Sequence, residues 1–194
     1  GVRPALIENA GKMAGMPVGP LAVTDEVTIE LAWKIGKETA RALGQEYPAD
    51  DTSKAICTMV EELDRKGKRY GKGFYDYPEE APKHLWPGLA EHFPLRDEQP
   101  DVQELIKRFL TIQALETARC VEEGVVTHPE DGDIGSIFGW GFPPYTGGTL
   151  SYIDTVGIAE FVAECDRMAR MYGPRFKVSD WLRERAESSQ DFYA

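Results

Sequence analysis

The sequence predicts an all-α fold. Apolar residues recur at three- and four-residue steps in several segments, most clearly over residues 101–123. The chain's 19 Gly and 13 Pro residues gather between those segments, where they favour turns. We find no convincing strand longer than about three residues, because apolar and polar positions do not alternate over any longer run.

The composition of the chain excludes several classes of function. A formal net charge of −11 argues against nucleic acid as a main partner, because phosphate binding needs clustered Lys and Arg. The 3 cysteines have no metal-ligand spacing and predict reduced thiols, which are typical of a cytoplasmic protein. No apolar run approaches the length of about 18 residues that a transmembrane helix needs. The chain starts at Gly1 rather than at Met, which indicates an excised piece of a longer protein.

Helices and turns alternate through the first half of the chain. Pro4 suits a first helical turn, and the helix that follows it ends at Gly15. Residues 16–20, Met-Pro-Val-Gly-Pro, then predict a turn. Two further helices are expected over about 24–44 and 52–67, each with Thr, Ser or Asp to cap its start and Gly to end it.

The segment 71–78 joins two Gly residues to three aromatic ones. We interpret it as a short extended segment whose rings cover the preceding helices. A phosphate-binding loop is the alternative, but no helix follows the glycines and Pro78 prevents one from starting at once. Residues 79–100 are polar and rich in Pro, and they mark the best boundary between two halves. His84 and His92 fall here without the Asp, Glu or Cys residues that would complete a metal site.

The second half begins with the clearest helix of the chain, 101–123, which carries charged pairs on its outer face. Shorter helices are expected over 129–138 and 158–172. A last helix, capped by Ser or Asp, is expected over 179–186.

The stretch 132–157 is rich in Gly, Pro and aromatic residues. We expect the rest of the chain to serve as a scaffold that supports this stretch. It is too apolar for a solvated loop, and its Gly and Pro content predicts a rigid turn rather than a regular helix. Two interpretations stay open: a helix–helix corner packed on the core, or one wall of a ligand cleft. A dinucleotide loop is rejected, because Gly139-Trp140-Gly141 is followed by Pro144 at the last position of G-x-G-x-x-G and no strand precedes it.

The two halves of the chain contain the same order of sequence features, which indicates an internal repeat. Residues 15–17, Gly-Met-Pro, precede Asp25 in the first half, and residues 141–143, Gly-Phe-Pro, precede Asp154 in the second. The order of features is the same, which predicts a duplication. Because the helix 101–123 precedes the second copy alone, the first copy is expected to expose an apolar face, through which a homo-oligomer could form.

Three ordered motifs resemble the C-terminal region of multifunctional fatty-acid oxidation proteins, which combine an enoyl-CoA hydratase with an NAD-dependent 3-hydroxyacyl-CoA dehydrogenase. The motifs are 5–10 with 15–20 and Asp25, then 73–77, and finally 133–137 with 139–144, 147–148 and 152–155. The resemblance covers nearly the whole chain. It implies two related helical halves of the 6-phosphogluconate dehydrogenase C-terminal-domain-like type: a truncated first dehydrogenase repeat at 1–78, a linker at 79–100 and a second repeat at 101–194.

The resemblance also implies an activity that this chain cannot perform alone. In the family, NAD binds to a separate domain, and a His–Glu pair and an Asn carry the proton chemistry; all of these are expected upstream of Gly1. None of the chain's 3 His residues matches the catalytic context, so no catalytic, cofactor-binding or metal-binding residue is predicted within it. The implied partners are an acyl-CoA substrate, the protein's own upstream NAD-binding domain and a thiolase subunit.

On the substrate side, the resemblance implies four contact residues. Phe138 stands where some bacterial members have a Tyr, so an apolar contact with an acyl or pantetheine group would survive while a hydrogen bond would not. Pro17, Val18 and Gly19 resemble the segment of the first repeat that faces the cleft. The alternative is a helical binding or assembly module without catalytic function, in which the fold is kept but the chemistry is not.

Overall fold

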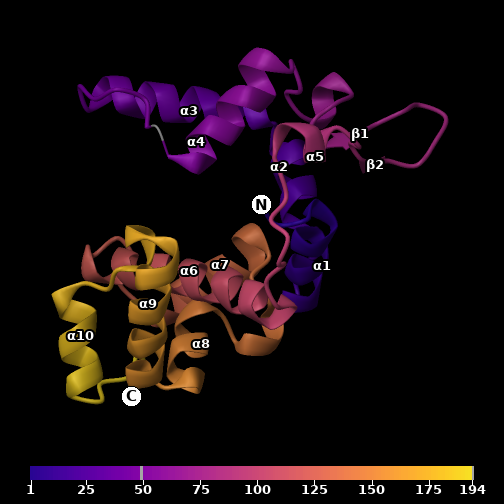
Figure 1. The fold of residues 1–194 in the computed structure, drawn as a ribbon. Coiled ribbons are helices and arrows are strands. Elements are labelled where there is room, and N and C mark those ends of the chain that lie inside the picture. The colour runs from indigo at the N-terminus through magenta and orange to yellow at the C-terminus, as the bar shows by residue number, and fades with distance from the viewer. Residues whose placement is uncertain (49, 194) are drawn as a thin grey trace. The chain divides into compact units, whose positions relative to one another are not determined.

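The computed structural model describes residues 1–48 and 50–193, and helices dominate it (Figure 1). The prediction of an all-α fold is confirmed. The chain forms two compact units, each of which has its own core. Unit 1 comprises Gly1–Asn9 and Val18–Pro100, and unit 2 comprises Ala10–Pro17 and Asp101–Ala194. Ala49 and Ala194, which belong to the two predicted repeats, lie outside the described residues.

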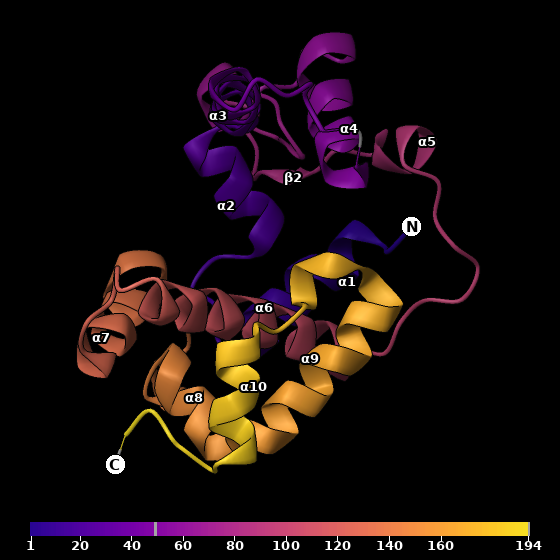
Figure 2. The ribbon, with the colours of Figure 1, turned by 90° about the vertical axis from the view of Figure 1, so that its left-hand side faces the viewer.

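Unit 1 consists mainly of helices (Figure 2), and its side chains form a small apolar core. Its core residues include Ile29, Met59, Val60 and Leu89, flanked by Trp33, Phe74 and Trp86. Its elements in order are the start of α1 (Pro4–Ala14), α2 (Pro20–Val27), α3 (Ile29–Ala42), α4 (Asp51–Cys57), the π-helical turn η1 (Thr58–Glu62), η2 (Lys68–Tyr70), β1 (Tyr75–Asp76), β2 (His84–Leu85) and α5 (Leu89–His92).

The helix expected over 24–44 is in fact two helices. The chain turns at Thr28, whose φ of 71° is incompatible with a continuous helix, and the Thr28 hydroxyl accepts a hydrogen bond from the Leu31 amide at the start of α3. The helix expected over 52–67 begins as α4, two or three residues earlier than its predicted caps imply, because the Asp50 carboxylate accepts hydrogen bonds from the amides of Thr52 and Ser53.

The short strands β1 and β2 pair antiparallel, with Tyr75 opposite Leu85 and Asp76 opposite His84. Arg65 lies buried behind this pair. Its guanidinium donates to the carbonyl oxygens of Gly73 (2.7 Å) and Tyr75 (3.1 Å) and stacks on the Trp86 ring at 4.1 Å. Within the segment 71–78 only Tyr75–Asp76 form a strand, and Phe74 packs against the core of unit 1, so the prediction is confirmed in part.

Unit 2 is a helical layer built around α6 (Val102–Glu122), which α8, α9 and α10 all contact (Figures 1 and 2). The Asp101 carboxylate caps α6 by accepting from the Gln103 amide. The other elements are the end of α1, α7 (Pro129–Trp140), η3 (Pro144–Thr146), α8 (Thr149–Val156), α9 (Ile158–Tyr172), η4 (Pro174–Phe176) and α10 (Asp180–Glu187). Its main core gathers apolar side chains of these helices, among them Leu115, Leu150, Ile153, Phe161, Cys165 and Leu182.

The expectation that 132–157 is not a regular helix is wrong for most of the stretch. α7 extends to Trp140 and α8 begins at Thr149, so the irregular part is confined to 141–148. The helix tolerates its internal glycines, and Gly132 has a packing reason: a β carbon there would lie 3.1 Å from Cγ2 of Thr117.

Two carboxylates, those of Glu8 and Asp25, link separate elements of unit 1 through hydrogen bonds. The Glu8 carboxylate on α1 accepts hydrogen bonds from the Leu21 amide (2.6 Å) at the start of α2 and from the Tyr75 hydroxyl (2.7 Å). Asp25, buried near the end of α2, accepts from the amides of Phe74 and Tyr75, both at 2.8 Å. Burial raises the pKa of the Asp25 carboxyl, and the two amide hydrogen bonds oppose that shift.

The same arrangement recurs in unit 2. Asp133 on α7 accepts from the Leu150 amide (2.6 Å) at the start of α8 and from the Tyr193 hydroxyl (2.8 Å). Asp154 on α8 accepts from the amides of Phe192 (3.0 Å) and Tyr193 (2.9 Å). Each unit thus holds a Phe-Tyr pair with two carboxylates, one from each of two successive helices. This repeated geometry supports the duplication that the sequence suggested.

Candidate functional site

The candidate site lies in unit 2, where two Gly-x-Pro corners meet. α1 ends at Gly15, which has a φ of 105°, and α7 ends at Gly141, which has a φ of 77°. Only Gly adopts such conformations readily, so each corner turns sharply at this residue and places a Pro two positions later. Both corners fall within unit 2, because Ala10–Pro17 pack with Asp101–Ala194 rather than with the rest of the first half.

The two corners pack reciprocally. A β carbon on Gly15 would lie 2.9 Å from Cβ of Pro143, and one on Gly141 would lie 3.0 Å from the ring of Pro17. The absent side chains are therefore what allows each Pro ring to approach the opposite backbone. Tyr145 adds a further link, since its hydroxyl donates to the Ala14 carbonyl oxygen at 3.1 Å.

The core side of the corner pair is fixed by Phe142. Its side chain is fully buried against Ala14 and Leu110 and meets the Tyr152 ring edge-on, with centroids 6.2 Å apart. Its amide donates to the Ser136 carbonyl oxygen at 3.0 Å. These contacts make the corner a rigid support rather than a mobile loop.

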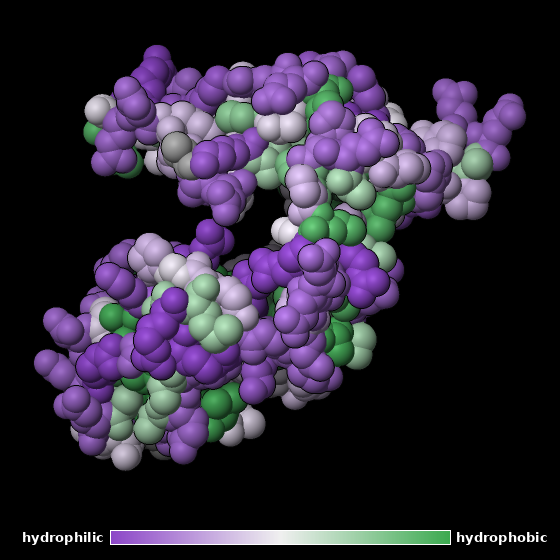
Figure 3. Space-filling view, viewed as in Figure 1, coloured by the Kyte–Doolittle hydropathy of each residue, from purple (hydrophilic) through white to green (hydrophobic). Residues whose placement is uncertain are grey.

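The outer side of the same corner is aromatic and open to solvent. Phe138, in the last turn of α7, is 86% exposed, and Tyr145 is 71% exposed. Trp140 is also exposed, although its indole N–H donates to the Gln113 side chain at 3.0 Å. We call Phe138, Trp140 and Tyr145 the aromatic face. Figure 3 shows one side of the molecule, on which hydrophobic residues form separate patches among hydrophilic ones.

The four residues predicted to contact substrate belong to two different units. Phe138 and Pro17 belong to unit 2, and both are exposed at the paired corner. Val18 and Gly19 belong to unit 1. Val18 is partly exposed, but Gly19 is buried, and a β carbon there would overlap the Glu8 carboxylate. Gly19 therefore has a structural reason to be Gly, and substrate contact by these four residues stays a prediction.

The described residues offer little to a metal or a dinucleotide. Among them no group of three His, Cys, Asp or Glu residues could hold a metal ion. The three His side chains are exposed; His92 stacks on Trp86, with ring centroids 5.4 Å apart, and His84 faces Asp76. In the same part of the chain the one sheet is the antiparallel β1–β2 pair, which cannot form the parallel βαβ unit that a dinucleotide fold requires.

Over 1–48 and 50–193, none of the helices combines the length and apolar character needed to span a bilayer.

The sequence of the chain is similar to that of known proteins. A family model described as the 3-hydroxyacyl-CoA dehydrogenase C-terminal domain matches residues 1–77. A fatty acid oxidation complex subunit alpha from Shewanella loihica is 38% identical over 183 residues, which cover 92% of this chain and 25% of that protein. The chain thus spans about a quarter of the length of this relative.

A solved structure supports the fold over both units. The crystal structure of 3-hydroxybutyryl-CoA dehydrogenase from Escherichia coli matches with a TM-score of 0.67 at 18% identity. The match covers 96% of this chain and 55% of the Escherichia coli one. At this identity the likeness establishes a shared fold.

Proposed function

We propose that the chain forms the substrate-side and assembly part of an NAD-dependent 3-hydroxyacyl-CoA dehydrogenase, because residues 1–77 match the model of that family's C-terminal domain and 92% of the chain is similar to a fatty acid oxidation complex alpha subunit. The parent protein would act in fatty-acid β-oxidation in the cytoplasm and would also carry enoyl-CoA hydratase activity. Its partners would be an acyl-CoA substrate, the NAD-binding domain of the same protein and a thiolase subunit.

The observation that supports a substrate role is the exposure of Phe138 on a rigid support. A Phe that is 86% exposed on a helix end gains apolar contact only when another group covers it. The buried Phe142 and the paired Pro rings hold the end of α7 in place, so the Phe138 ring is presented without a large loss of backbone entropy on binding. An acyl or pantetheine chain is the apolar group that the proposed substrate offers.

The chain's own residues would bind and orient substrate and exclude water from it, while NAD accepts or gives the hydride when it is bound to a separate domain. No proton-transfer step is assigned to the described residues, because the aromatic face itself contains no His or carboxylate side chain. Asp25 and Asp133 are instead engaged by backbone amides and Tyr hydroxyls.

The proposal is tested by assaying the parent protein and this chain alone with acetoacetyl-CoA and NADH. We expect turnover by the parent and none by the chain. A correctly folded parent without turnover would favour the alternative, a helical binding or assembly module without catalysis. Turnover by the chain alone would contradict the assignment of the catalytic groups to another part of the protein.

An apolar stripe on α3 supports self-association as a second property. Leu31 and Ile35 lie one helical turn apart and are both exposed. At the corresponding positions of α9, Glu160 is exposed and Glu164 pairs with Arg167. Light scattering at high protein concentration should detect an oligomer that a Leu31→Glu, Ile35→Glu variant does not form; a strictly monomeric parent would contradict this point.

A further inference from the structure

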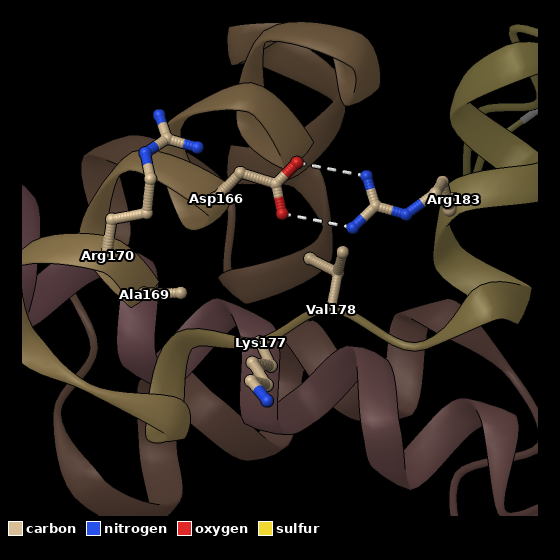
Figure 4. A pocket seen from close by; sticks show the side chains of 6 residues that line it. All are labelled: Asp166, Ala169, Arg170, Lys177, Val178 and Arg183. Carbon is tan, nitrogen blue, oxygen red and sulfur yellow. Dashed lines mark hydrogen bonds and ion pairs between the residues drawn. The ribbon is translucent and has the colours of Figure 1, made fainter.

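A pocket on unit 2 lies apart from the aromatic face and has no part in the proposed activity. It has a volume of about 350 Å³ and opens among α9, the segment after η4 and the start of α10 (Figure 4). Its lining consists of Asp166, Ala169, Arg170, Lys177, Val178 and Arg183. The volume falls within the range of about 300–1,000 Å³ that is typical of small-molecule sites.

One ion pair holds the pocket together. The Arg183 guanidinium binds the Asp166 carboxylate through two hydrogen bonds of 3.0 Å each, which join α10 to α9 above Val178 (Figure 4). The hydrogen bonds from Arg183 lower the pKa of the Asp166 carboxyl. Asp166 therefore stays ionised and neutralises Arg183 at neutral pH.

The segment between η4 and α10 is also anchored. The Arg119 guanidinium on α6 donates to the carbonyl oxygens of Arg175 (2.8 Å) and Lys177 (2.9 Å). At the start of α10 the Ser179 hydroxyl accepts from the Leu182 amide. The backbone that carries Lys177 and Val178 into the pocket is thus fixed at both ends.

Two cations of the pocket form no close ion pair. Arg170 and Lys177 are exposed, and no ion pair within 4.0 Å joins either to another described residue, although Arg170 acts on Asp166 through space. With Arg183 and Asp166 they bring the lining to a net charge of two positive, in a chain whose net charge is −11. Asp180 and Glu187 also act on Arg183 through space, but they are not part of the lining. An excess of positive charge at a cavity favours an anion.

We propose that this pocket binds an organic phosphate monoester. A phosphate dianion matches the net charge of the lining. The ends of the long Arg170 and Lys177 side chains point in different directions in Figure 4, so binding requires both exposed side chains to turn toward the phosphate. The cavity is larger than a phosphate group, and Ala169 and Val178 give it an apolar wall for the organic part of the ligand. Binding of this ligand does not depend on the dehydrogenase reaction, so a failure of the proposed function would not contradict this proposal.

Isothermal titration of the full chain with phenyl phosphate, inorganic phosphate and uncharged phenol tests the proposal. We expect phenyl phosphate to bind more tightly than inorganic phosphate and phenol not to bind. The double variant Arg170→Gln, Lys177→Gln should weaken phenyl phosphate binding at least about tenfold, because it removes two charge-assisted contacts. The ion pair between Asp166 and Arg183 is left intact in this variant, so the join between α9 and α10 is kept.

The matched control is the double variant Lys12→Gln, Arg69→Gln, which removes the same charge from exposed positions outside the pocket. Its affinity should stay within about twofold of the unmodified chain. Equal weakening in the two double variants would show a non-specific charge effect and overturn the proposal. Absence of binding to the unmodified chain, or equal affinity for inorganic and phenyl phosphate, would overturn it as well.

Discussion

Gly141 lies against Pro17, so close that a β carbon on the glycine would be 3.0 Å from Cδ and Cγ of the proline ring. The contact joins the end of α7 to the end of α1, although the two residues are far apart in the sequence. It also explains why the first-half segment 10–17 packs with the second half. The aromatic face depends on this contact for its fixed position.

Replacing Gly141 by Ala should therefore lower the free energy of unfolding by about 2–3 kcal/mol. The positive φ of 77° accounts for about 1 kcal/mol and the overlap with Pro17 for the remainder. Gly124 provides the control, since its φ is 71° and a β carbon there would meet nothing within 4 Å. Urea denaturation of both Ala variants should show the larger loss for position 141; equal losses would mean that the Pro17 contact has no energetic weight.

We expect the Asp154 carboxylate, which accepts hydrogen bonds from the amides of Phe192 and Tyr193, to contribute to the free energy of unfolding as well. Asp154→Asn replaces one acceptor oxygen by an amide that faces backbone N–H groups, so we expect a loss of about 1–3 kcal/mol in unfolding free energy. Asp97→Asn, at an exposed position, should change it by less than about 0.5 kcal/mol. Hydrogen exchange at the amides of Phe192 and Tyr193 should accelerate in the first variant, and unchanged protection there would contradict the role given to Asp154.

Asp25 and Asp166 should respond to pH in opposite directions. Burial raises the pKa of Asp25 above 3.8, so the folded state holds its proton more tightly than the unfolded chain does, and this group's contribution to stability falls as pH rises through and above 3.8. Arg183 lowers the pKa of Asp166 below 3.8, so the stability from that pair is present above pH 3.8 and is lost as pH falls below it.

Urea denaturation of the Asp25→Asn and Asp166→Asn variants between about pH 3 and pH 7 measures this difference. Relative to the unmodified chain, Asp25→Asn should gain stability as pH rises, and Asp166→Asn should lose it. The Asp166 effect should stay below about 1 kcal/mol, because the pair is partly exposed and screened by solvent. Parallel pH trends in the two variants would contradict the assigned shifts.

The sequence predicted the helices with long apolar periods well, because α6 and α9 carry their own apolar pattern, and Asp101 caps the start of α6. It failed at Thr28, where a β-branched residue takes a positive φ that no local preference indicates. Asp25 looked like a helix cap, yet its partners are amides 49 and 50 residues away. Tyr193 was missed as a partner of Asp133 for the same reason, since a hydrogen bond across 60 residues leaves no local trace.

The candidate site was predictable in part. The two Gly-x-Pro corners and the choice of Phe138 as a candidate residue follow from sequence motifs, whereas the exposure of Phe138 does not. That Gly15 meets Pro143 while Gly141 meets Pro17 depends on tertiary packing, and so does the burial of Gly19 against Glu8. The internal repeat in the sequence aligns Asp25 with Asp154. It does not reveal their hydrogen-bond partners, Phe74-Tyr75 and Phe192-Tyr193.

The kinetics of a Phe138→Ala variant of the parent protein test the central claim most directly. If the ring contacts the acyl or pantetheine part of the substrate, KM for acetoacetyl-CoA should rise about tenfold while kcat stays within about twofold, because the contact is made equally in the ground and transition states. Met171→Ala, at another exposed apolar position of unit 2, should change neither constant. An unchanged KM in a folded Phe138→Ala protein would contradict the claim that the aromatic face binds substrate.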